Sequence, residues 1–114
     1  MKVAIIGSRN VKLHSISDFV PEKIAGLMTE IITGGAVGID ILALNYAREK
    51  NIKVTIFKPE YERYKKGAPL IRNQLIVDAS DFVIAIWDGK SRGTKYTIDY
   101  AKKMNKEIKI YMLE

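Results

Sequence analysis

Glu30-Ile-Ile-Thr-Gly-Gly-Ala-Val-Gly-Ile-Asp40 is the stretch that decides the fold, because it joins an apolar run to a helical pattern through a glycine-rich turn. Similar short runs rich in β-branched residues occur at 3–6, 53–57, 82–87 and 108–113. The runs at 3–6 and 82–87 are apolar throughout, which is typical of central parallel strands buried on both faces. The runs at 53–57 and 108–113 alternate with lysines, as edge strands often do.

Helical patterns separate these runs. The clearest stripe places Ile39, Leu42, Ala43, Tyr46 and Ala47 at helical spacing. Shorter patterns are Ile71, Leu75 and Ala79 behind Pro69, then Thr97, Tyr100, Ala101 and Met104, and a weaker helix at about 20–27. Strand alternating with helix predicts an α/β fold, a Rossmann-like three-layer sandwich with a five-stranded parallel sheet and helices on both faces. The 114 residues are expected to form a single domain, 1–114.

Composition excludes several classes of site. The chain has no cysteine and one histidine, His14, which excludes disulfides, thiolate zinc sites and cages of several histidines, so we expect no metal. No apolar run approaches the length of about 18 residues that a membrane span needs, and the expected compartment is the cytoplasm. The formal net charge of +6 favours anionic partners such as phosphate-bearing ligands.

Ligands of such sheets bind beyond the carboxyl ends of the strands, and the sequence is unusual there. Gly34 and Gly35 allow the backbone to approach a ligand closely, and the following helix offers amides to a phosphate. A tight turn with glycines for packing alone is the alternative interpretation. Asp40, in the first helical turn, is expected either to cap that helix or to accept a bond from a ribose hydroxyl.

The loop at 87–94 and the helix after Pro69 supply further polar groups. Ser91, Thr94 and the glycine amides of the loop are expected to cradle a phosphate, unless the loop is simply a surface turn. Arg72 suits a phosphate, and Asn73 suits a base or ribose. The alternative for Arg72 is a pairing with a nearby carboxylate on the surface. Tyr61 and Tyr64 stand among basic residues and suggest either a base-stacking lid or a solvated loop.

Three better-known motifs do not fit. The dinucleotide fingerprint needs a glycine where Thr33 stands and should follow the first strand. A P-loop needs a glycine where Ile84 stands. The G-x-S-x-G spelled by 89–93 lacks a later histidine, which a serine hydrolase would require.

Four pieces in register resemble the SLOG superfamily, and most closely its short single-domain branch of YspA-like and YpsA-related proteins. The pieces are 7–9, 34–40, 67–73 and 87–94. The superfamily also holds the lysine decarboxylase-like phosphoribohydrolases and the DNA-processing protein DprA. The resemblance implies a strand order of 3-2-1-4-5 and a site for a nucleotide or nucleotide-derived ligand. It marks as ligand-binding candidates Gly7, Ser8, Arg9, Gly34, Gly35, Gly38, Asp40, Arg72, Asn73, Asp88, Gly89, Ser91, Gly93 and Thr94.

Three functions follow as hypotheses. In the phosphoribohydrolases an arginine and a glutamate cleave the base–ribose bond; Arg72 matches the arginine, but the glutamate position falls on Thr97. A nucleotide-binding module or sensor without strong catalysis is therefore the first hypothesis, with no certain cofactor. The second is a nucleotide N-glycosidase or other nucleotide hydrolase, with Arg72, Asp40 and Asp88 as candidate catalytic residues. The third is a DprA-like single-stranded DNA binder.

The expected partners are a nucleotide or nucleotide-derived small molecule and, less so, a nucleic acid, but no membrane. Relatives that pair through their helices suggest a homo-oligomer. Its candidate contacts are Tyr46, Tyr96, Tyr100 and Met104.

Overall fold

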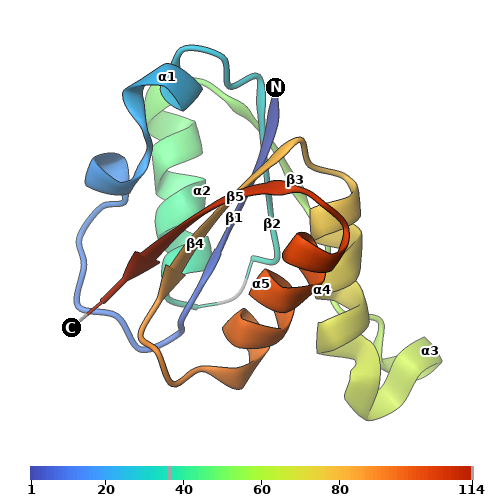
Figure 1. The fold of residues 1–114 in the computed structure, drawn as a ribbon. Coiled ribbons are helices and arrows are strands. Elements are labelled where there is room, and N and C mark those ends of the chain that lie inside the picture. Colours follow the sequence, from blue (N-terminus) through green and yellow to red (C-terminus); the bar gives the residue numbers. More distant parts are fainter. Residues whose placement is uncertain (36, 114) are drawn as a thin grey trace.

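The computed structural model describes residues 1–35 and 37–113, and these form one parallel sheet of five strands in the order β3-β2-β1-β4-β5 (Figure 1). The strands are β1 (Lys2–Gly7), β2 (Glu30–Thr33), β3 (Lys53–Ile56), β4 (Phe82–Trp87) and β5 (Glu107–Met112). The predicted fold class and strand order are confirmed. The two lysine-alternating runs are the edge strands, as their pattern indicated.

Helices cover both faces of the sheet, α1 and α2 on one and α4 and α5 on the other (Figure 1). Their bounds are α1 (Glu22–Ala25), α2 (Ile39–Lys50), α3 (Tyr61–Tyr64), α4 (Ala68–Asp78) and α5 (Arg92–Lys103), with short 3-10 turns η1 (Ser17–Phe19) and η2 (Lys65–Gly67). None of the helices described is long and apolar enough to cross a membrane.

Alternate residues of the central strands serve two separate cores. Val3 and Ile5 of β1 face the core under α2, whereas Ala4 and Ile6 face the core under α4 and α5. Because successive side chains of a strand point to opposite faces, a strand buried on both sides must be apolar throughout. This requirement explains the uninterrupted apolar runs of β1 and β4.

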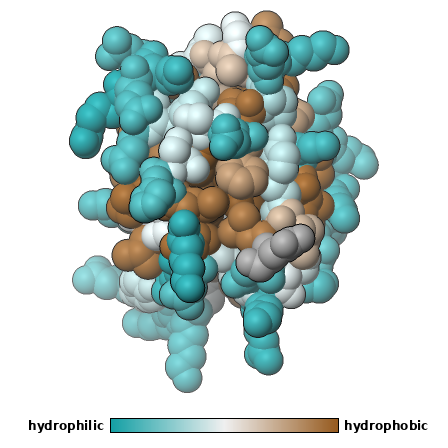
Figure 2. Space-filling view, turned by 90° about the vertical axis from the view of Figure 1, so that its left-hand side faces the viewer, coloured by the Kyte–Doolittle hydropathy of each residue, from teal (hydrophilic) through white to brown (hydrophobic). Residues whose placement is uncertain are grey.

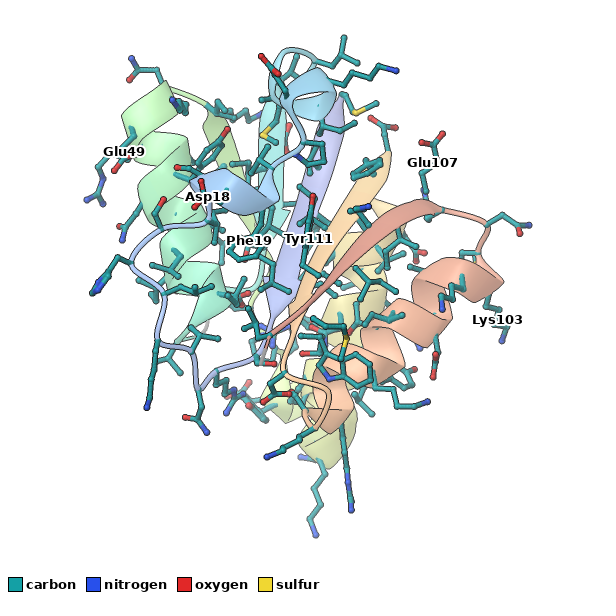
Figure 3. All side chains as sticks on the ribbon, turned by 60° about the vertical axis from the view of Figure 1, so that its left-hand side comes forward. Asp18, Phe19, Glu49, Lys103, Glu107 and Tyr111 are labelled. Carbon is teal, nitrogen blue, oxygen red and sulfur yellow. The ribbon has the colours of Figure 1, made fainter. Side chains whose placement is uncertain are left out.

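The segment before α1 packs across the α2 face and reaches the edge strand β5. The rings of Phe19 and Tyr111 meet edge-to-face, with centroids 5.3 Å apart and planes at 75° (Figure 3). Val11 and Leu13 pack against the same core and remain partly exposed. Apolar residues therefore stand among charged ones on this side of the molecule (Figure 2).

Several expected helical details are wrong. The expected helix at 20–27 is only the four-residue α1. Helix α4 packs through Ala68, Arg72 and Ile76 rather than through the expected stripe, whose Leu75 is 43% exposed.

The expected contact role of Tyr46 is also wrong, because that side chain is only 6% exposed and belongs to the core under α2.

Thr33, at the end of β2, carries a buried hydroxyl whose Oγ1 has no hydrogen-bond partner among the described residues. An unsatisfied buried polar group costs about 1–3 kcal/mol, so we expect Thr33→Val to raise the free energy of unfolding by about 1 kcal/mol. Denaturant unfolding measures this change. Thr97→Val is the matched control, because the Thr97 hydroxyl donates to the Gly93 carbonyl oxygen at 2.8 Å and its removal should bring no gain. Equal effects of the two substitutions would contradict the prediction.

Candidate functional site

A cleft of about 540 Å³ lies at the carboxyl end of the sheet, toward the bottom of Figure 1, where α2, α4 and α5 begin. Nine of the residues predicted from the sequence line it: Gly7, Arg9, Asp40, Arg72, Asn73, Asp88, Ser91, Gly93 and Thr94. They share the cleft with Asn10, Lys90 and Thr97 and with apolar residues that include Val37, Pro69 and Leu70. The volume is in the range of pockets that bind small molecules and cofactors.

The remaining predicted residues, Ser8, Gly34, Gly35, Gly38 and Gly89, do not line the cleft. Ser8 is buried and acts as a junction between elements. Its carbonyl oxygen accepts the amide of Ile39 at 3.3 Å, and its Oγ accepts the amide of Asp88 at 3.1 Å. Ser8 therefore fixes the start of α2 and the loop after β4 relative to β1.

Two glycines of the turn at 33–40 adopt positive φ, Gly35 at 70° and Gly38 at 81°. A Cβ on Gly38 would lie 2.5 Å from the carbonyl oxygens of Ser8 and Arg9. Glycine is thus required at position 38 by both its conformation and its packing against the β1 loop.

Arg72 is buried beneath the cleft, and its guanidinium is held by the protein. Nη1 donates to the carbonyl oxygens of Gly34 at 3.1 Å and Phe57 at 3.4 Å, and Nε donates to Asn73 Oδ1 at 2.8 Å. Burial lowers the pKa of Arg72, whereas the nearby Asp40 carboxylate opposes that shift. Arg72 thereby ties α4 to the ends of β2 and β3.

The side chains of Asp40 and Arg72 both lie close to Gly34. A Cβ on Gly34 would lie 2.5 Å from Arg72 Nη1 and 3.0 Å from Asp40 Oδ2. Asp40 is itself only 9% exposed, in the first turn of α2. Because glycine has no side chain, position 34 leaves space for the guanidinium of Arg72 and the carboxylate of Asp40.

Asp88 closes the loop after β4 on itself. Its Oδ1 accepts the amides of Lys90 and Ser91, both at 2.8 Å. These two bonds are the main reason that the pKa of Asp88 lies below its ordinary value. A carboxyl group held ionised in this way is a poor proton donor, and the two amides it occupies are not available to a phosphate.

The backbone amides of the first turn of α5 lie next to this loop. The first turn of any α-helix has amides with no intrahelical acceptor, and Ser91 makes no side-chain capping bond to them. Thr94 and Thr97 face the cleft from the same helix.

The lining of the cleft includes two exposed cationic side chains. Arg9 and Lys90 are exposed, and neither forms an ion pair with any part of the chain that the structure describes. Arg9 is close enough to lower the pKa of Arg72 further, which is the signature of two neighbouring cations. No group of three or more His, Asp or Glu side chains that suits a metal ion lies within residues 1–35 and 37–113.

Tyr61 and Tyr64 belong to α3, which projects beyond α4 at the lower right of Figure 1. Tyr61 is 57% exposed, and the Arg63 guanidinium lies 5.2 Å from the centre of the Tyr64 ring.

Fold and cleft together define a Rossmann-type α/β domain with an open crevice at the carboxyl edge of its sheet. A solved structure with this architecture is that of DNA processing protein A (DprA) from Helicobacter pylori, described for its single-stranded DNA binding mode. The two superpose with a TM-score of 0.75 at 25% sequence identity, over 100% of this chain and 66% of that one. This chain therefore spans about two-thirds of the length of that solved chain. No protein-family model and no curated protein matches the sequence.

Proposed function

We propose that the chain binds a nucleotide or nucleotide-derived ligand in the cleft, with its phosphate near Arg9, Lys90 and the N-terminus of α5. The observation that carries this proposal is the pair of unmatched cations beside uncapped helix amides. A phosphate there would gain charge-assisted hydrogen bonds and would relieve the repulsion between Arg9 and Arg72.

Binding without rapid turnover is the form of this function that the residues support. Thr97 lines the cleft where the phosphoribohydrolase pattern has glutamate, and its hydroxyl donates to a backbone carbonyl. Asp88 is engaged by two amides, and Asp40 is buried next to Arg72. We therefore expect measurable binding of nucleoside 5′-monophosphates with little release of free base.

Single-stranded DNA binding is a second candidate, and the structural similarity to DprA favours it. The exposed Tyr61 and the basic residues 63, 65 and 66 belong to the segment that leads directly into α4, whose first residues line the cleft. Such groups suit stacked bases and a phosphate backbone. A short oligothymidylate that binds far more tightly than thymidine monophosphate would favour this candidate over the first.

Removal of either unmatched cation tests the phosphate position. We expect Arg9→Ala and Lys90→Ala each to weaken nucleotide binding by about tenfold to a hundredfold in calorimetric titration, because a charge-assisted bond contributes about 1.5–3 kcal/mol. Lys2→Ala is the control, since it removes the same charge from the amino end of β1, whereas the cleft lies at the carboxyl end of the strands. If Lys2→Ala weakened binding as much as the other two, the effect would come from net charge and the proposed position would be wrong.

A further inference from the structure

The orientation of the Asn73 amide is determined by its neighbour. An arginine Nε–H can only donate, so the atom of Asn73 that lies 2.8 Å from Arg72 Nε must be the oxygen, Oδ1. Arg72 is in turn fixed by its bonds to the carbonyl oxygens of Gly34 and Phe57. The Asn73 side chain is therefore locked in one of its two amide orientations.

This orientation leaves the amide nitrogen for the cleft. Asn73 lines the cleft and is partly exposed, and no residue within 1–35 or 37–113 accepts a hydrogen bond from its Nδ2. Oδ1 already accepts a charge-assisted bond, and a second donor arriving there would be placed beside the guanidinium. Toward a ligand, Asn73 acts as a hydrogen-bond donor.

The lining of the cleft offers two kinds of group, which suit different parts of a nucleotide. The unmatched cations Arg9 and Lys90 favour the phosphate, as proposed above. Pro69 and Leu70 stand on α4 within one turn of Asn73, and Leu70 is 37% exposed. An apolar surface next to one fixed polar group is the arrangement that typically orients a flat, mostly apolar ring.

We infer that Asn73, held by Arg72, selects the base of the ligand, and that the cleft prefers bases with a carbonyl oxygen over bases with an amino group at the edge that meets Asn73. The inference rests on the proposed function. An asparagine that reads adenine uses its oxygen and its nitrogen together, on the amino group and on N7. Here the oxygen is engaged, so an amino group would meet a donor, whereas the carbonyl of hypoxanthine, guanine or uracil would meet its complement.

Matched nucleotides test this inference in the unmodified protein. Inosine and adenosine monophosphates differ at the base by a carbonyl in place of an amino group, and uridine and cytidine monophosphates differ in the same way. We expect the carbonyl member of each pair to bind about tenfold to a hundredfold more tightly in calorimetric titration, the range of one specific base contact. Equal binding within both pairs, or tighter binding of the amino members, would overturn the inference.

The substitution Asn73→Asp removes the hydrogen-bond donor at position 73 but keeps the acceptor for Arg72 Nε. A carboxylate at position 73 still accepts the bond from Arg72 Nε, but it offers an acceptor where Nδ2 was a donor. We expect the order within each pair of nucleotides to invert, and the ratio of the two affinities, unlike their absolute values, is insensitive to the added negative charge. An unchanged order in a folded Asn73→Asp protein would overturn the role of Asn73.

Ribose 5-phosphate separates this inference from the proposed function. It carries the phosphate and sugar without a base, so its binding reports the phosphate position alone. Binding of ribose 5-phosphate together with equal binding of all four nucleotides would reject base selection and leave the proposed function in place. No binding of ribose 5-phosphate or of any nucleotide would reject both.

Discussion

Gly38→Ala is expected to lower the free energy of unfolding by about 3 kcal/mol or more. Position 38 has φ 81° and ψ −127°, a conformation that costs a residue with a Cβ about 1–3 kcal/mol. The new Cβ would also lie 2.5 Å from two carbonyl oxygens and 2.6 Å from the Arg9 Cα, all of them backbone atoms that cannot rotate away. Denaturant unfolding monitored by circular dichroism would measure the loss.

Gly67→Ala is the matched control for this substitution. Position 67 has φ −80°, and a Cβ there would have no atom within 4 Å. We expect its free energy of unfolding to change by less than about 1 kcal/mol. Similar losses for the two variants would mean that the turn at position 38 tolerates a side chain, against the geometry described above.

The fold could be predicted because strands that are buried on two faces have a recognisable apolar sequence pattern. A central parallel strand has no solvent face, so β1 and β4 read as unbroken apolar runs. Helix α2 has one buried stripe, and its period is visible from Ile39 to Ala47. These features depend on local spacing alone, and the sheet order followed from the resemblance of the loops.

The buried face of α4 could not be predicted in the same way, because it contains a charged residue. A search for apolar spacing passes over Arg72 and selects Leu75, whereas the structure buries Arg72 and leaves Leu75 exposed. Arg72 is accommodated because carbonyl oxygens at the ends of β2 and β3 accept hydrogen bonds from its guanidinium. Those partners are 38 and 15 residues away in the chain, so no local pattern indicates them.

Within the site, the sequence indicated which loops meet but not how their polar groups are used. The glycines at 34 and 35 suggested a ligand close to the backbone, yet a Cβ at either position would meet side chains of the protein itself. For Asp88 a signal was present, because an aspartate two residues before a free amide commonly closes a turn on its own backbone. Asn73 was predicted from the sequence and lines the cleft, but the direction of its amide depends on Arg72.

Gly34→Ala is expected to act on the cleft through Arg72. The added methyl would lie 2.5 Å from Nη1 and 2.8 Å from Cζ of that side chain, so the guanidinium must leave its place. It would then lose its bonds to the Gly34 and Phe57 carbonyl oxygens and separate from Asp40. Breaking a buried, partnered charge in this way typically costs about 3–5 kcal/mol, and we expect a loss in that range together with weaker nucleotide binding.

A double-mutant cycle distinguishes displacement of Arg72 from a general effect of the methyl group. In Arg72→Met the shorter, uncharged side chain leaves no guanidinium for the methyl to displace, so adding Gly34→Ala should cost less than about 1 kcal/mol. The interaction energy of the cycle is then expected to be about 2–4 kcal/mol, obtained from the unfolding free energies of the four proteins. Additive effects would show that Gly34 matters for a reason other than Arg72. A large interaction energy would instead show that the glycine at position 34 leaves the space that the guanidinium of Arg72 needs. Arg72 then connects α4 to the ends of β2 and β3, and the shape of the cleft depends on that connection.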